Sequence, residues 1–89
     1  MLEQQIEIIN KLGLHARASA KLVSTSARFG CRVEVEFGSH TADAKSIMSV
    51  MMLAASVGSV VTLRTDGNEE HEAMVAVTAL ITNYFNEEE

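Results

Sequence analysis

The sequence has one cysteine, no proline and no long uninterrupted apolar run. The single cysteine, Cys31, cannot form an intramolecular disulfide, and no cysteine pair exists that could anchor a zinc ion. The longest stretch without charge, residues 46–63, is broken by serine, glycine and threonine, whereas a membrane-spanning helix needs about 20 predominantly apolar residues. The first eight residues also lack the basic start and apolar segment of a secretory signal. We therefore expect a cytoplasmic protein with no membrane insertion, no metal site and no cofactor.

Positive charge is also scarce, and its distribution is uneven. The net charge of −5 argues against DNA or RNA as a partner, because the phosphate backbone would be repelled. Residues 1–49 carry a net charge of +1 and residues 50–89 a net charge of −6. The N-terminal half is thus the half that can tolerate an anion.

Residues with strand-like patterns occur in four places. Ile6 and Ile8 lie on either side of Glu7 in a segment that ends near Asn10, and residues 32–37 alternate strictly between charged and apolar. Gly38 and Ser39 suit a two-residue turn, which would pair Val35 with Ala42 and Val33 with Ala44 in a short edge strand. Residues 60–65 are rich in β-branched side chains and predict the fourth strand.

Helical patterns fill the segments between these strands. A first helix is expected from Ala16 and ends before Gly30, with an apolar stripe of Ala16, Ala20, Val23 and Ala27. A short second helix follows Ser46, a favoured N-cap. Glu69, Glu70 and Glu72 favour the start of a third helix, whose predicted apolar face is Ala73, Val77, Leu80, Ile81 and Tyr84. The acidic residues 87–89 are expected to be frayed.

The predicted order of elements is β-α-β-β-α-β-α. It indicates an α+β fold in which a four-stranded antiparallel sheet carries three helices on one face, as an open-faced two-layer sandwich. The composition, 47% hydrophobic and 21% charged, is that of an ordinary globular protein, and 89 residues suffice for one domain spanning residues 1–89.

The segment Gly13-Leu14-His15-Ala16-Arg17 places an imidazole at the predicted start of the first helix. The unpaired backbone N–H groups of Ala16 and Arg17 and the Arg17 guanidinium make such a place suited to an anion. A neutral imidazole nitrogen can attack phosphorus, and the anion formed would meet these same groups. A lone histidine near a helix end is more often a solvated or capping residue, so the spacing alone does not decide its role.

Two motifs together do indicate a role. Asn-Lys-Leu-Gly-Leu-His-Ala-Arg at residues 10–17 and Lys-Ser-Ile-Met-Ser-Val-Met at residues 45–51 resemble the two signature regions of the HPr family. These are histidine phosphocarriers of the bacterial phosphoenolpyruvate-dependent sugar phosphotransferase system. The length and the order of elements match the family from end to end.

The resemblance implies a role for each matching residue. His15 would accept a phosphoryl group on Nδ1 from enzyme I and pass it to enzyme II A components, with Arg17 stabilising the charge. Ser46 matches a position that a dedicated kinase phosphorylates in many members. Ile47, Met48 and Met51 match the patch on which partners dock, with Lys21 and Lys45 as contacts at its rim, while Val50 and Leu53 are expected in the core. A carrier that needs this face free is expected to be a monomer without an independent catalytic reaction.

One departure from the family pattern concerns Ala18, where most members have proline directly after the arginine. Proline in the first turn of a helix is pre-organised rather than reactive, so its absence concerns the rigidity of the site and not its charges.

Three alternatives stay open from the sequence. The first is a carrier of the nitrogen branch, the NPr type, which has the same chemistry and other partners. The second is a regulatory binding protein that acts through Ser46, and the third is an interaction module without phosphoryl transfer. The remaining histidines, His40 and His71, are expected to be solvated, and Cys31 is expected to be a small packing residue.

Overall fold

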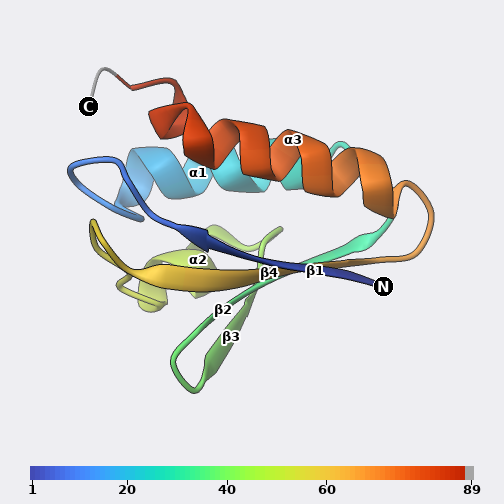
Figure 1. Cartoon of the computed structure of the whole chain (residues 1–89), viewed down its shortest axis with the longest axis horizontal. Helices are drawn as coiled ribbons and strands as arrows, with labels where there is room; N and C mark the ends of the chain where they lie inside the picture. Colours follow the sequence, from blue (N-terminus) through green and yellow to red (C-terminus); the bar gives the residue numbers. More distant parts are fainter. Residues whose placement is uncertain (88–89) are drawn as a thin grey trace.

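The computed structural model describes residues 1–87, which form one sheet and three α-helices followed by a short C-terminal turn (Figure 1). The elements in chain order are β1 (Leu2–Glu7), α1 (Ala16–Ser26), β2 (Arg32–Phe37), β3 (His40–Asp43), α2 (Ile47–Met52), β4 (Val60–Asp66), α3 (Glu70–Thr82) and the turn Tyr84–Asn86.

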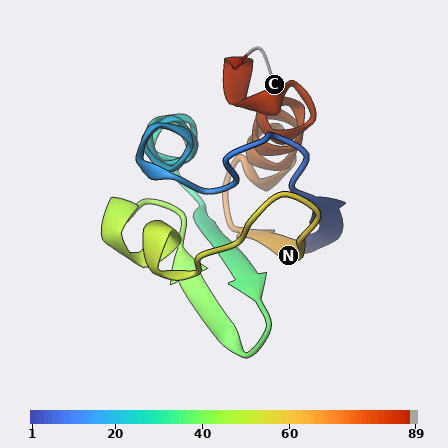
Figure 2. The ribbon, with the colours of Figure 1, turned by 90° about the vertical axis from the view of Figure 1, so that its left-hand side faces the viewer.

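The strands lie in the order β1-β4-β2-β3, and every neighbouring pair is antiparallel. All three helices cover one face of this sheet, with α1 and α3 side by side and antiparallel, and with α2 next to α1 (Figures 1 and 2). The α+β open-faced sandwich predicted from the sequence is therefore confirmed. Among residues 1–87, no helix is both long enough and apolar enough to cross a membrane.

The β2–β3 hairpin has the predicted register. Val35 lies opposite Ala42, and the amide of Ala44 donates to the carbonyl of Val33 at 2.9 Å. Gly38 adopts a φ of +62°, which the first position of this turn requires and which glycine adopts without steric cost. β3 forms one edge of the sheet, as expected.

The core lies between the sheet and the helices. Alternate residues of β2 and β4 point into it, because successive side chains of a strand face opposite sides of the sheet. Val33, Val35, Val61 and Leu63 are each about 1% exposed. The period-two pattern of the sequence thus reports the buried face of these strands correctly.

The buried face of α1 differs from the predicted stripe. Ala16 and Ala27 are exposed, and the buried residues are Ala18, Ser19, Leu22 and Ser26. Leu22, the largest apolar side chain available, sets the inward face, since burying it removes the most apolar surface from water. Ser19 can be buried because its hydroxyl donates to the carbonyl of Leu14 at 3.0 Å.

The end of α3 also departs from the prediction. Ala73, Val77, Leu80 and Ile81 are buried as expected, but Tyr84 is 40% exposed and Phe85 is fully buried in its place. The helix ends at Thr82, and the next turn has positive φ, so the helical spacing no longer decides which side chain points inward. Glu87, expected to be frayed, is held by hydrogen bonds, and the same expectation for residues 88 and 89 lies outside the described residues.

Candidate functional site

The loop between β1 and α1 holds its conformation through close backbone contacts. The amide of Gly13 donates to the carbonyl of Asn10 at 3.1 Å, and the amide of Leu14 donates to the carbonyl of Ala55 at 2.9 Å. Gly13 has a φ of +63°, and a Cβ built on it would lie 2.5 Å from the Ala55 carbonyl oxygen. Only glycine fits here without displacement, and the tight loop fixes the residue that begins α1.

That residue is His15, the N-cap of α1. Its backbone is extended, with φ −73° and ψ 179°, and its carbonyl accepts the first helical hydrogen bond from Ser19 at 2.8 Å. Its Nδ1 accepts a hydrogen bond from the amide of Arg17 at 3.3 Å, longer than the usual value of about 2.9–3.0 Å. The histidine therefore takes the place that serine or aspartate occupies at many helix starts.

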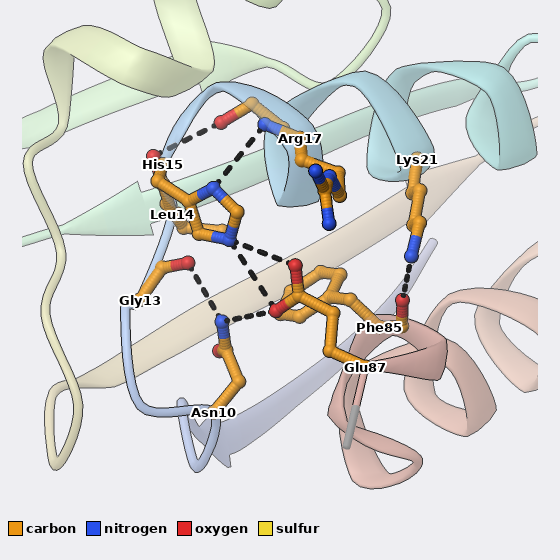
Figure 3. A network of polar contacts seen from close by, with 9 residues as sticks. Asn10, Gly13, Leu14, His15, Arg17, Lys21, Phe85 and Glu87 are labelled. Atoms are coloured by element: carbon orange, nitrogen blue, oxygen red, sulfur yellow. Dashed lines mark hydrogen bonds and ion pairs between the residues drawn. The ribbon is translucent and has the colours of Figure 1, made fainter. Parts of the chain in front are cut away.

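The other ring nitrogen of His15 faces Glu87, which comes from the C-terminal end of the described chain (Figure 3). Nε2 lies 2.9 Å from Oε2 and 3.3 Å from Oε1 of this carboxylate. A carboxylate only accepts, so Nε2 carries a proton, and the amide donation from Arg17 requires a lone pair on Nδ1. Both contacts thus agree on a neutral ring with its free electron pair at the helix N-terminus.

Asn10 connects the loop to this carboxylate. Its side-chain amide donates to the Gly13 carbonyl at 2.8 Å and to Glu87 Oε1 at 3.3 Å (Figure 3). Asn10 is fully buried, so these bonds form in a place where water competes little. The asparagine thereby holds the Glu87 carboxylate as well as the loop that carries His15.

The environment of Glu87 favours its charged form. Desolvation acts to raise the pKa of the Glu87 carboxyl, but it is outweighed by the hydrogen bonds from His15 and the Asn10 amide and by the charge of Lys21, so the pKa is lower than usual. The side chain is 14% exposed and that of His15 is 26% exposed. The pair is therefore partly shielded from water while the ring stays accessible.

The two basic side chains near the site are engaged differently. The Arg17 guanidinium is exposed, and within residues 1–87 no hydrogen bond or ion pair engages it, which leaves it able to meet an incoming anion. The Lys21 ammonium donates to the carbonyl of Phe85 at 2.6 Å and so ties α1 to the C-terminal turn (Figure 3). Of these two side chains, Arg17 is the one that the sequence predicts to stabilise the charge of the phosphoryl group. Its own positive charge is not engaged within the described residues.

The second motif places its residues on α2 as the pattern predicts. Ser46 is the N-cap, and its hydroxyl accepts from the amide of Ser49 at 3.4 Å. Ile47, Met48 and Met51 are 42%, 68% and 37% exposed, and we refer to these three as the α2 patch. Val50 and Leu53 are buried, as expected. Lys45, predicted at the rim of this patch, donates through its ammonium to the carbonyl of Phe29 at 2.8 Å.

Sequence reasoning missed two residues of the site. Asn10 carries a local signal, since asparagine just before a glycine turn commonly bonds to nearby backbone. Glu87 carries none, because 72 positions separate it from His15 and only the fold brings them together. Cys31 is buried, and in the described part of the chain no three histidine, cysteine or carboxylate side chains converge where a metal ion could bind.

Comparison with known proteins assigns the family. A family model described as the phosphorylation site of the HPr component of the phosphotransferase system, PTS, matches residues 2–83. The chain belongs to the HPr family. It is 57% identical to the phosphocarrier protein HPr of Cupriavidus necator and 55% identical to that of Neisseria meningitidis, in each case over the full length of both chains. It is thus an HPr-type phosphocarrier of the phosphotransferase system.

Solved structures of the family agree with the fold. A crystal structure of HPr from Thermoanaerobacter tengcongensis matches with a TM-score of 0.96 and 45% identity over the whole of both chains. The catabolite-repression protein Crh of Bacillus subtilis matches with a TM-score of 0.76 and 38% identity, covering 94% of this chain and 97% of that one. That relative is described as a dimer with a swapped domain.

Proposed function

We propose that His15 accepts a phosphoryl group on Nδ1 from phosphorylated enzyme I in the cytoplasm and donates it to enzyme II A components. The observation that carries the proposal is the orientation of the ring, whose Nδ1 faces the amide of Arg17 at the N-terminus of α1 while Nε2 faces the carboxylate of Glu87. The relatives from Cupriavidus necator and Neisseria meningitidis are both named phosphocarrier protein HPr, which supports such a role.

The transfer step uses groups that are already in place. The Nδ1 lone pair forms the new N–P bond, the bond between phosphorus and the donor atom of enzyme I breaks, and its electron pair returns to that donor atom. Once Nδ1 is bound to phosphorus it no longer accepts from the amide of Arg17. That amide and the amide of Ala16 are then available to the phosphoryl oxygens at the positive end of the helix.

Arg17 supplies a mobile positive charge for the same anion. Its guanidinium can bind two phosphoryl oxygens at once, which a lysine ammonium cannot do with the same geometry. Because phosphoryl transfer depends mainly on positioning and electrostatics, a single well-placed cation is a substantial part of the site.

The test of the proposal is phosphorylation by enzyme I and phosphoenolpyruvate, followed by detection of acid-labile phosphate on the protein. We expect one phosphoryl group per chain, and none in His15→Ala. His40→Ala and His71→Ala serve as matched controls, since both histidines are exposed, and both variants should be labelled like the parent. Labelling that persists in His15→Ala would refute the proposal.

A second, regulatory part of the proposal concerns Ser46 and the α2 patch. We propose that partners dock on Ile47, Met48 and Met51, with Lys21 and Lys45 at the rim, and that a kinase acting on Ser46 weakens this docking. A phosphate adds about −1.5 to −2 charge at pH 7 beside an apolar surface. Ser46→Asp should raise the enzyme I concentration needed for half-maximal transfer, whereas Ser46→Ala should leave it unchanged. Equal values for the two variants would remove the regulatory role.

The working form we propose is a monomer, because docking on the α2 patch requires that face to be free. Crh, described as a dimer with a swapped domain, is one relative that argues for testing this directly. Light scattering during gel filtration should give the mass of one chain, 9.7 kDa, at the concentrations used for transfer assays. A mass of two chains in the active fractions would contradict a monomeric carrier.

A further inference from the structure

The chain after α3 folds back in an unusual conformation. Tyr84, Phe85 and Asn86 have φ values of 57°, 53° and 61°, a left-handed run that residues with a Cβ rarely adopt. Such a conformation persists only where its surroundings hold it, and it is commonest at functional sites.

Several contacts hold this turn. The ring of Phe85 is fully buried in the core, and its carbonyl accepts from the Lys21 ammonium at 2.6 Å. The amide of Glu87 donates to the carbonyl of Tyr84 at 2.9 Å, and the side chain of Asn83 bonds to that of Asn86 at 2.7 Å. The turn is therefore anchored from α1, from the core and from within.

The consequence of this turn is the position of Glu87. Its carboxylate reaches Nε2 of His15 at 2.9 Å, and Asn10 holds its other oxygen at 3.3 Å (Figure 3). The contact joins the C-terminal segment to the loop before α1, and Figures 1 and 2 show both at the same end of the molecule. None of the contacts described for α2 or its patch involves Glu87, so its place in the structure is beside the ring rather than on the docking surface.

We propose that Glu87 is a positioning residue for phosphoryl transfer: by accepting the Nε2 proton it presents the Nδ1 lone pair and stabilises the charged ring of the phosphorylated state. This inference rests on the proposed role of His15 as the phosphoryl acceptor. It extends the site to Glu87, beyond the two sequence motifs.

The charge balance of the step explains why a carboxylate is useful here. When Nδ1 bonds to phosphorus, the proton stays on Nε2 and the ring acquires positive charge, which the Glu87 carboxylate opposes at 2.9 Å. In the onward transfer a nucleophilic group of the acceptor bonds to phosphorus, the N–P bond breaks, its electron pair returns to Nδ1, and the ring becomes neutral again. An aspartate plays a comparable part for the histidine of Ser-His-Asp triads, where it orients the ring and stabilises the imidazolium.

The experiment compares Glu87→Ala, which removes the acceptor, with Glu87→Gln, which keeps an acceptor but removes the charge. Glu3→Gln is the control for loss of one negative charge, since Glu3 forms its ion pair with Arg64 on the sheet, at 2.6 Å. The full-length chain is phosphorylated by enzyme I, and kcat and KM are measured for each variant. The ¹⁵N signals of the His15 ring report which nitrogen carries the proton.

For Glu87→Ala we expect kcat to fall roughly tenfold, equivalent to about 1.4 kcal/mol, while KM for the carrier stays within about twofold. The fall for Glu87→Gln should be smaller, because the amide oxygen can still accept from Nε2–H. In the unmodified protein with a neutral His15 ring, the ¹⁵N signals should show a proton on Nε2 and none on Nδ1. In Glu87→Ala the same signals should show a mixture of the two tautomers. Glu3→Gln should change neither measurement.

Each contrary result has a defined meaning. Unchanged kcat in Glu87→Ala would overturn the inference, as would a raised KM with unchanged kcat, which would assign Glu87 to docking. A ring of the unmodified protein that is protonated mainly on Nδ1 would overturn it independently of any variant. Failure of the proposed function is distinguishable from all of these, since it would appear as absent labelling of the unmodified chain or as labelling of His15→Ala.

Discussion

Replacing Gly13 by alanine should distort the loop that carries His15. The substitution places a Cβ 2.5 Å from the carbonyl oxygen of Ala55 and 2.8 Å from Cα of Ser56, distances that real Cβ atoms do not show. Both neighbours are backbone atoms, so the clash cannot be relieved by a change of rotamer. The loop or the segment around Ala55 must move.

The size of the effect follows from two contributions. A left-handed conformation costs an alanine roughly 1–2 kcal/mol relative to glycine, and Gly13 has a φ of +63°. Moving the loop away from Ala55 also weakens the hydrogen bond from the Leu14 amide, 2.9 Å long, and a typical backbone hydrogen bond contributes about 0.5–1.5 kcal/mol. We expect Gly13→Ala to lower the free energy of unfolding by about 1.5–3.5 kcal/mol.

Gly38 offers a matched control, because its φ is +62° and no atom lies within 4 Å of the position its Cβ would take. Gly38→Ala should therefore lower the free energy of unfolding only by the conformational cost of the left-handed residue, about 1–2 kcal/mol. Urea unfolding monitored by circular dichroism measures both variants, and a 1 kcal/mol loss corresponds to a Tm lower by about 4–8 °C in a domain of this size. Equal losses for the two variants would show that the close approach at Gly13 contributes nothing, and would refute the reasoning.

Three further predictions concern other parts of the site. Phe85→Ala should lower the free energy of unfolding by about 3–5 kcal/mol, measured by urea unfolding, because the ring is fully buried; a loss below 1 kcal/mol would contradict its role as an anchor. In single-turnover assays Arg17→Ala should slow phosphoryl transfer from enzyme I by roughly tenfold or more, and Arg17→Lys should slow it less, because lysine keeps the charge but loses the paired binding of oxygens by the guanidinium. Identical transfer rates in Arg17→Ala and Arg17→Lys would contradict this prediction. Because the pKa of Glu87 is lower in the folded protein, its contribution to stability is present above its unfolded pKa, about 4.3, and disappears as pH falls through the folded value. His15, Asn10 and Lys21 face this carboxylate, and the stability difference between the parent and Glu87→Gln should accordingly shrink on acidification from pH 7; a constant difference would disprove the assignment.

Much of the fold could be predicted from local sequence, because the responsible interactions are local. The alternation of residues 32–37 predicts a strand, Gly38 and Ser39 predict the turn, and the register of the β2–β3 hairpin follows from the two together. Ser46 predicts the start of α2 for the same kind of reason, since an N-cap acts on an amide only three residues away. The position of His15 at the start of α1 is equally a local property.

The buried face of α1 could not be obtained in this way. A search for a helical pattern of apolar residues counts alanine as apolar and serine as polar. In the structure, however, Ala16 and Ala27 are exposed and Ser19 is buried. Small side chains gain little from burial, so the larger Leu22 and the bond of Ser19 to Leu14 decide the orientation. Which neighbours a helix packs against is decided by the assembled fold.

The sequence by itself thus determined the order of the elements, the two motifs and the family to which they belong. Tertiary structure decided which groups meet at His15. Its two ring nitrogens illustrate the difference: Nδ1 meets the amide of Arg17 two residues away, whereas Nε2 meets Glu87, which is 72 residues away. A contact of the first kind follows from the geometry of one helix turn. A contact of the second kind exists only because α3 packs beside α1, Phe85 enters the core and a left-handed turn brings Glu87 back to the ring.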